Sequence, residues 1–199
     1  MKKYELTSET KVINGVVLHR IKALESFGDV KNGDLGGWIE SEKNLSQSGN
    51  AWVGGNATVR GNAKVYGNAT VDENATVDEN ATVGEYATVC GNATIRGNAT
   101  VFMTATVGGD ATISGKARVG GDATVRGEKD YIVFKNWWSS GRYFTWTRSN
   151  NKWAVGCFYG SGEELIAKAY RDSEKSGREY ERVVNYVESI LKEEENNNK

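Results

Sequence analysis

The sequence is poor in several residue types that often shape a fold or a reaction centre. None of its 199 residues is proline, two are cysteine and one is histidine. Without proline, turns have to be formed by Gly, Asn and Asp, which tolerate positive φ. The two cysteines, Cys90 and Cys157, fall in segments of different character. Their separation argues against a disulfide framework and favours a reducing compartment.

Charge and hydrophobicity are not concentrated in any part of the chain. The sequence has 25 basic and 26 acidic residues and a formal net charge of −1, so we expect no duplex nucleic acid or anionic membrane as partner. No apolar run approaches the roughly 18 residues of a membrane span, and no apolar segment follows the lysines of MKKYELTSET at the start. We therefore expect a cytoplasmic protein without a membrane partner.

A six-residue repeat occupies the middle of the chain. Alanine recurs at every sixth position from Ala51 to Ala123, and Val or Ile recurs in the same phase from Val53 to Val125. Thr fills ten of the thirteen positions between them. In an extended triplet Ala and Val face one side and Thr the other, so the aliphatic pair is predicted to lie inside. The Gly and Asn or Asp residues that follow each triplet indicate a corner.

Strands this short bury an apolar face only if successive units coil and stack. Three units per turn would close a triangular prism, and the run resembles the single-stranded left-handed parallel β-helix of hexapeptide-repeat proteins. Residues 18 apart should then lie above one another. One such column alternates large and small residues: Tyr66, Gly84, Phe102 and Gly120. We expect a mainly β protein with a β-helix of about four coils over residues 47–127, an N-terminal β cap over 1–46, an α+β module over 128–193 and a disordered tail over 194–199.

Proteins with this repeat are best known as acyltransferases, which use a histidine base between prisms. The one histidine, His19, precedes every repeat, and a zinc site of three imidazoles would need three histidines. Thr arrays of the kind that bind ice are present, but they occupy all faces and also suit ordinary β-propensity. Mimicry of DNA would need a strongly acidic surface, which the near-neutral charge does not provide. The repeat therefore predicts a spacer or an oligomerisation surface, and an acyltransferase remains an alternative.

The segment before the repeat contains a hairpin signal and a second resemblance. Asn14 and Gly15 lie between two strand-like runs, which predicts a tight β-turn. Residues 27–53 then carry Gly28-Asp29-Val30, Gly33, Gly36-Gly37-Trp38 and Leu45-Ser46. With the following hexads, this segment resembles a family of bacterial and phage hexapeptide proteins often labelled transferases or polymer-forming cytoskeletal proteins.

The composition changes abruptly after the repeat. Three strands are predicted, at residues 131–135, 142–148 and 152–159, followed by two helices. Each helix is expected to open with a capping box, Ser161 with Glu164 and Ser176 with Glu179. The strings SSGRYFTWTRSNNKW and VGCFYGSGEELI resemble a C-terminal module of proteins from phages that infect Gram-positive bacteria. That resemblance implies a viral or prophage origin and no particular activity.

Aromatic and cationic residues alternate in this module and form our candidate ligand site. Stacking on aromatic faces combined with charge pairing suits a small anionic, nucleotide-like ligand. Alternatively, the aromatic side chains form the core of a small domain and the cations lie outside. The candidate residues are Trp137, Trp138, Arg142, Tyr143, Trp146, Arg148, Lys152 and Trp153.

Together these patterns predict a phage-type binding protein that is not an enzyme. Its expected role is to sequester a nucleotide-like ligand, as an anti-defence protein would, in the cytoplasm of the bacterial host. We see no catalytic constellation, no metal-ligand spacing and no motif that calls for a cofactor. The prism favours a homo-oligomer, with a trimer as the preferred form. A structural scaffold that binds another protein is the main alternative.

Overall fold

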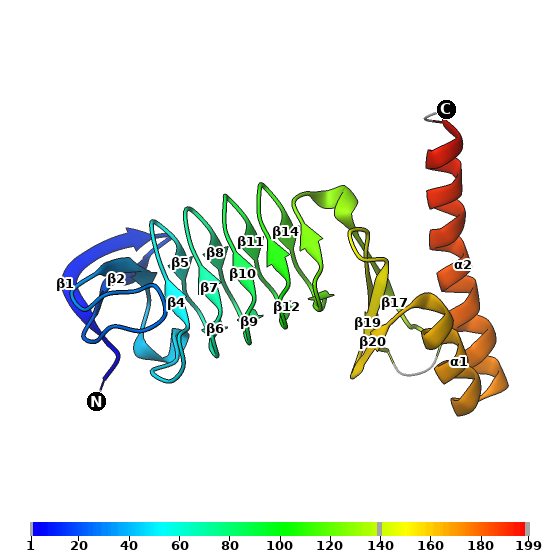
Figure 1. Ribbon diagram of the computed structural model, residues 1–199, viewed down its shortest axis with the longest axis horizontal. Helices are drawn as coiled ribbons and strands as arrows, with labels where there is room; N and C mark the ends of the chain where they lie inside the picture. The colour runs from blue at the N-terminus through cyan, green and yellow to red at the C-terminus, as the bar shows by residue number, and fades with distance from the viewer. Residues whose placement is uncertain (1, 139–140, 198–199) are drawn as a thin grey trace.

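The computed structural model describes residues 2–138 and 141–197, and it has the form of an elongated prism with a different cap at each end (Figure 1). A β-hairpin lies across the N-terminal end, and a sheet followed by two helices lies at the C-terminal end. Between them the chain winds through stacked parallel coils, which confirms the predicted left-handed β-helix. The fold is mainly β, as expected.

Each coil contributes one short strand to each of three parallel sheets. Pairing advances by 18 residues per coil, as between Thr58 and Thr76 in neighbouring strands. The sheet orders are β3-β5-β8-β11-β14, β4-β7-β10-β13-β16 and β6-β9-β12-β15. The strands are β3 (Leu35–Ile39), β4 (Trp52–Val53), β5 (Thr58–Val59), β6 (Lys64–Val65), β7 (Thr70–Val71), β8 (Thr76–Val77), β9 (Thr82–Val83), β10 (Thr88–Val89), β11 (Thr94–Ile95), β12 (Thr100–Val101), β13 (Thr106–Val107), β14 (Thr112–Ile113), β15 (Arg118–Val119) and β16 (Thr124–Val125).

The interior of the prism is aliphatic throughout. Every repeat alanine from Ala51 to Ala123 and every Val or Ile from Val53 to Val125 is buried, with at most 1% of its surface exposed. The Thr side chains face outward, as the two-residue alternation predicts. The repeat side chains that fill this interior are aliphatic, and the other side chains of the hexads lie on the outer faces and at the corners.

The β-helix begins earlier than the predicted residue 47. Strand β3 already pairs in parallel with β5, and Leu45 bridges to Val65, so residues 35–53 form a complete first coil. Close backbone approach explains the Gly36-Gly37 pair. A Cβ on Gly37 would lie 2.7 Å from the carbonyl oxygens of Gly54 and Ala57. The resemblance noted for residues 27–53 therefore covers the loop of residues 27–34 and the first coil.

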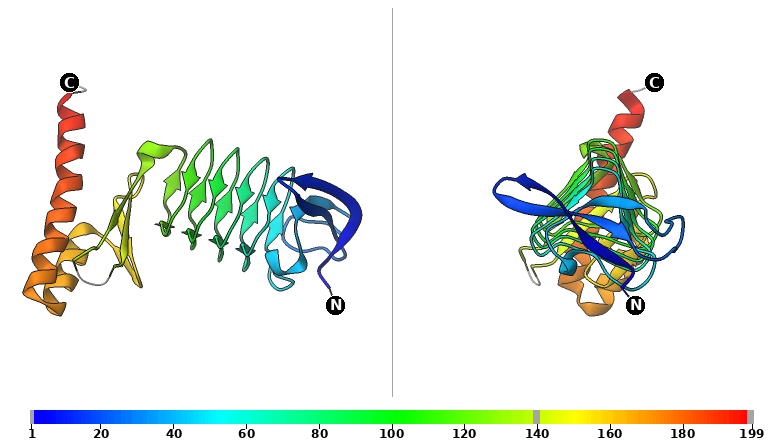
Figure 2. Two further views of the ribbon diagram at one scale, coloured as in Figure 1. Left: turned by 180° about the vertical axis from the view of Figure 1, so that it is seen from behind. Right: turned by 90° about the vertical axis from the view of Figure 1, so that its left-hand side faces the viewer.

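The N-terminal hairpin joins this first coil through β3. Strands β1 (Tyr4–Ile13) and β2 (Val16–Ala23) are antiparallel, and β2 pairs with β3. Asn14 and Gly15 between them have φ values of 51° and 80°, which confirms the predicted turn. Figure 2 shows the hairpin lying across the end of the prism. The hairpin therefore covers the coil that has no neighbour on its N-terminal side.

The C-terminal module is a four-stranded antiparallel sheet with two helices. Its strands are β17 (Tyr131–Lys135), β18 (Tyr143–Thr147), β19 (Lys152–Val155) and β20 (Phe158–Gly160), in sequence order. The predicted third strand is thus two strands, because Gly156 adopts a φ of 57° and the chain turns there. Two short 3-10 helices also occur, at Glu42–Asn44 and Glu128–Asp130.

The helices differ from the expected ones at two points. Helix α1 (Gly162–Asp172) has the predicted capping box of Ser161 and Glu164. Helix α2 (Glu174–Asn197) begins earlier than predicted, since the Ser173 hydroxyl, not that of Ser176, accepts a backbone N–H bond at its start. The predicted disordered tail is also wrong for residues 194–197, which continue α2. Residues 198–199 lie outside the described part of the chain.

The two faces of the C-terminal sheet have different neighbours. Phe144 and Trp146 point toward α1 and α2, while Thr145 and Thr147, also buried, point toward the prism. The Thr145 hydroxyl accepts a 2.8 Å bond from the Arg118 backbone N–H in the last coil. In Figures 1 and 2 the sheet accordingly stands between the prism and the helices, and α2 runs crosswise to the long axis.

Candidate anion-binding cleft

The structure does not bring the eight predicted ligand-binding residues together. Trp146 and Trp153 are 1% and 2% exposed and belong to the core between the sheet and the helices. Their rings contact aliphatic and aromatic neighbours, so neither can stack on a ligand. The alternative interpretation is correct for these two residues, because strand alternation turns them toward the helices.

Trp137 and Trp138 follow β17 and have different environments. Trp137 is 83% exposed, and its ring meets that of Trp138 edge to face. Trp138 packs against Phe144 and Tyr180, and its indole N–H lies buried with no acceptor in the described ranges. Trp138 therefore supports the helical core, while Trp137 presents a free ring to solvent.

Arg148 and Lys152 lie at the far end of the sheet from Arg142 and Tyr143. Arg148 is five positions after Tyr143 along an extended strand, which corresponds to about 16 Å. The Arg148 guanidinium donates to the Glu194 carboxylate at 2.8 Å, and this contact raises the pKa of Arg148 and lowers that of Glu194. The same ion pair joins the end of α2 to the sheet.

Arg142 and Tyr143 instead meet the last coil of the prism and line a cleft there. A space of about 300 Å³ lies between them and the side chains of Lys116 and Arg118. The Lys116 ammonium nitrogen is 5.7 Å from the Tyr143 ring centroid. The Arg118 guanidinium stacks 4.8 Å from the Phe102 centroid, and its buried Nε has no hydrogen-bond partner among the described residues. We call this space and its continuation the seam cleft.

The seam cleft continues on the other side of Lys116 and Tyr143. There a second space of about 630 Å³ is bounded by Arg96 and Tyr131, among others. The Tyr131 hydroxyl donates to the Thr112 carbonyl at 2.6 Å, and burial together with Glu128 raises the pKa of Tyr131. Tyr131 therefore remains a neutral donor that joins the sheet to the prism.

The seam cleft favours an anionic ligand with an aromatic part. Four cationic side chains and one carboxylate line its two spaces, so the local field is positive although the chain as a whole is nearly neutral. The half-buried Tyr143 ring at its centre can stack on a planar group. The charged lining residues are Arg96, Lys116, Arg118, Arg142 and Glu128.

Three of these cations were missed in the sequence, although a signal exists. Lys116 stands where most hexads have Asn or Asp, and Arg118 stands where most have Thr. Arg60, Asp78 and Arg96 are spaced 18 residues apart and therefore form one column along the prism. Arg96 is the cation of that column that lies beside the cleft. At these positions the residue type departs from the repeat, and stacking of the coils does not require the change. Such departures could have indicated the cleft.

Other candidate chemistry is sparse. His19 lies in β2, where it pairs with Thr10 and Ile39 at the opposite end of the molecule. Cys90 is half-buried, Cys157 is exposed, and both are free thiols. Over residues 2–138 and 141–197 no group of three His, Cys, Asp or Glu side chains is arranged to hold a metal ion. Within the same ranges, no helix has the length and apolar character needed to cross a bilayer.

Comparison with known proteins gives one partial similarity. Over 61 residues the chain is 38% identical to an "Uncharacterized acetyltransferase YdcK" of Escherichia coli (strain K12). The similar region is 27% of this chain, and it spans only about a fifth (19%) of that protein's length. No family model matches the chain. The similarity agrees with a hexapeptide-type β-helix and extends to a minor part of both proteins.

Proposed function

We propose that the protein is a non-catalytic binding protein that holds a small anionic, nucleotide-like ligand in the seam cleft. The observation that carries the proposal is that the side chains of Lys116, Arg118 and Arg142 line one space together with Tyr143, at the contact between two parts of the fold. Ligand sites often occur at such contacts between structural units.

Each part of a nucleotide has a counterpart in the cleft. Phosphate oxygens would pair with the Lys116 ammonium and the guanidinium groups, since charge-assisted hydrogen bonds are the strongest available. The base would stack on Tyr143, whose ring already lies near a cation. We assign the protein to retention of the ligand and not to its conversion.

The resemblance of the C-terminal module to phage proteins suggests the biological setting. A viral protein that retains a nucleotide can deprive a bacterial defence system of its signal. We propose this anti-defence role in the host cytoplasm, carried out by a homo-oligomer with a trimer as the preferred form. A scaffold that binds another protein would use the same rigid prism as a spacer.

Isothermal titration calorimetry with nucleoside monophosphates, cyclic dinucleotides and ADP-ribose tests the proposal. We expect at least one of them to bind, and Lys116→Ala and Tyr143→Leu each to weaken binding by about tenfold, the loss of one charged or stacked contact. The matched control is Lys192→Ala, an exposed lysine on α2, which should leave the affinity unchanged.

Two results would contradict this function. Absence of binding heat with every nucleotide would exclude nucleotides as the ligand. Equal affinity in wild type, Lys116→Ala and Tyr143→Leu would exclude the seam cleft as the binding site. Size-exclusion chromatography with light scattering on the same samples tests the trimer, because the mass of the assembly distinguishes it from a monomer.

An acyltransferase is the second candidate, and the similarity to a protein named an acetyltransferase favours it. In that reaction an acetyl group moves from the thioester of acetyl-CoA to a hydroxyl or amine, and the CoA thiol is released. Thiol release with acetyl-CoA and a panel of amino and hydroxyl acceptors would detect it. His19 is the sole imidazole of the chain, so the activity should fall by orders of magnitude in His19→Ala if that residue is the base.

A further inference from the structure

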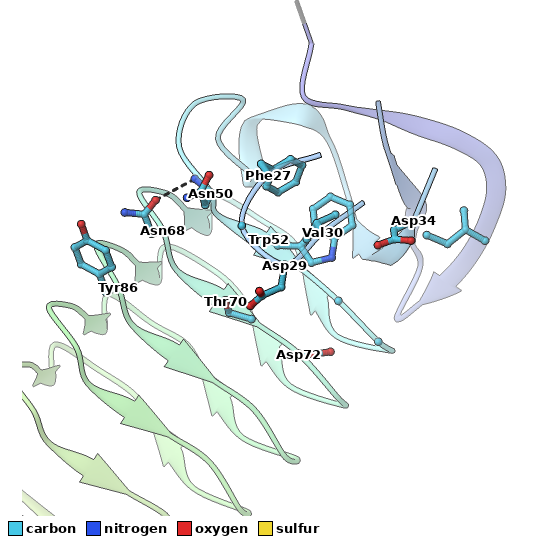
Figure 3. Close-up of a pocket in the computed structure, with 14 residues that line it drawn as sticks. Phe27, Asp29, Val30, Asp34, Asn50, Trp52, Asn68, Thr70, Asp72 and Tyr86 are labelled. Atoms are coloured by element: carbon cyan, nitrogen blue, oxygen red, sulfur yellow. Dashed lines mark hydrogen bonds between the residues drawn. The ribbon is translucent and has the colours of Figure 1, made fainter. Parts of the chain in front are cut away.

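A second cavity lies at the opposite end of the molecule from the seam cleft. A groove of about 750 Å³ runs along β4 and β7 beneath the loop of residues 27–34 (Figure 3). Phe27, Asp29 and Val30 come from the loop, while Trp52 and Thr70 come from the strands. The size of this space falls in the range usual for sites that bind small molecules.

The groove coincides with departures from the hexad repeat. Trp52 occupies a position that is Thr in most hexads, and Tyr86 occupies one that is usually Asn or Asp. Tyr86 is 66% exposed, so stacking of the coils does not explain its ring. Both aromatic residues line the same groove although they lie almost two coils apart in the sequence. Two departures from the repeat thus bring aromatic side chains to the same groove.

Tyr86 also interrupts a series of hydrogen bonds that elsewhere on the prism join the side-chain amides of corner residues in successive coils. Asn62 bonds to Asn80 and Asn74 to Asn92, in each case through the side-chain amide to the residue one coil on. Asn68 has Tyr86 at that position, so its amide N–H groups have no acceptor in the parts of the chain that the structure describes. An amide that is paired in neighbouring columns is therefore available in the groove.

The polar groups of the groove comprise donors as well as acceptors. Unpaired donors among the described residues include the Trp52 indole N–H, the Asn50 and Asn68 amides and the Thr70 and Tyr86 hydroxyls. The acceptors are carboxylates of Asp29, Asp34 and Asp72. Asp72 is held over the Gly54-Gly55 backbone, where an added Cβ would come within 2.8 Å of its oxygen. The lining contains no Lys or Arg.

This mixture distinguishes between classes of ligand. An anion would meet three carboxylates and no cation, and an ammonium ligand offers donors only, so it would leave the donors of the groove unused. A sugar hydroxyl both donates and accepts, and its ring has apolar faces that can lie on aromatic side chains. We propose that the groove binds a short neutral oligosaccharide, with Tyr86 as the exposed platform and Asp29 as a principal acceptor.

Protein-observed NMR with maltotriose, cellotriose and chitotriose as probes tests this site. We expect at least one trisaccharide to shift the Trp52 indole N–H signal saturably, with the signal assigned from Trp52→Phe. Tyr86→Asn and Asp29→Asn should each weaken binding by about tenfold, the loss of one stacked or hydrogen-bonded contact. Tyr86→Asn restores the residue type of that hydrogen-bonded series, so it should fold normally. Tyr186→Asn, at an exposed tyrosine on α2, is the matched control and should leave binding unchanged.

Three outcomes would overturn the proposal. The first is that none of the trisaccharides moves the Trp52 signal. The second is that spermidine or AMP, added as cationic and anionic probes, saturates the groove while the sugars do not. The third is that sugar binding persists in full in both Tyr86→Asn and Asp29→Asn.

Discussion

At the scale of single residues, Lys3 shows how the open end of the prism is closed. Its side chain is 2% exposed, and its ammonium donates to the carbonyls of Gly49 and Ala51 at 3.1 and 2.7 Å. The ammonium also lies 4.8 Å from the Phe27 ring centroid. Burial lowers the pKa of Lys3 to about 8, and the attraction of Glu25 offsets part of that effect. A buried cation thus satisfies carbonyls that have no neighbouring coil.

The lowered pKa predicts a pH dependence of stability. Between pH 8 and the ordinary value of 10.5 the unfolded chain holds the Lys3 proton and the folded chain releases it, so folding becomes more favourable as the pH rises. From pH 7 to pH 9 the free energy of unfolding should increase by about 1 kcal/mol relative to Lys3→Met. Urea denaturation of both proteins measures it, and parallel pH profiles would refute it. Above pH 9 the raised pKa of Cys90 acts in the opposite direction.

At the scale of the coil, the column of alternating large and small residues works as the sequence predicts. A Cβ on Gly84 would lie 2.2 Å from the Tyr66 ring, and one on Gly120 would lie 2.2 Å from Phe102. Each large ring therefore lies across the backbone of the glycine one coil on. The glycines are needed here for space, because neither has a positive φ.

A double-mutant cycle tests this packing. Gly84→Ala should destabilise the protein by about 1–2 kcal/mol, because the added methyl group displaces the Tyr66 ring. In a Tyr66→Ala background the same change should have almost no effect, since the space is then empty. Chemical denaturation of the four proteins gives the coupling energy. Additive effects would show that the ring and the glycine are independent.

At the scale of the whole molecule, the C-terminal sheet covers the last coil and creates the seam cleft. Besides Thr145, the Ser149 hydroxyl accepts a 2.7 Å bond from the Thr124 backbone N–H. Asn150 donates to Asp122 at 2.9 Å in the same region. These contacts satisfy polar groups that would otherwise form open strand edges, which are sites of aggregation.

Removal of this cap should expose the edges. A chain that ends at residue 127 should self-associate more strongly than the full chain, because the backbone groups of β14, β15 and β16 then pair with another copy. Light scattering over a concentration series measures this tendency. A Thr145→Val variant of the full chain is the control, since it loses one edge contact and keeps the cover. Equal association of the truncated and full chains would contradict the capping role.

The parts that could be predicted are those for which local sequence carries the information. Strand β17 has the predicted bounds, and the hairpin turn at Asn14 and Gly15 follows from residues that tolerate positive φ. The corners of the prism were predicted less completely. Glu73 and Glu85 adopt positive φ without being glycine, and their carboxylates accept N–H bonds from Gly91 and Met103 in the next coil. Those compensating bonds span 18 residues and cannot be read from a single hexad.

By itself the sequence determined the coils, because each hexad repeats one local rule, aliphatic inside and turn residues at the corner, and 18 residues close the prism. Only the tertiary structure decided where the aromatic and cationic residues of the C-terminal module are used. Alternate side chains of β18 meet the helices on one face and the prism on the other, so Trp146 enters a core while Tyr143 reaches the seam cleft. That division depends on which surface covers each face, and the contacts that set it join residues far apart in the chain.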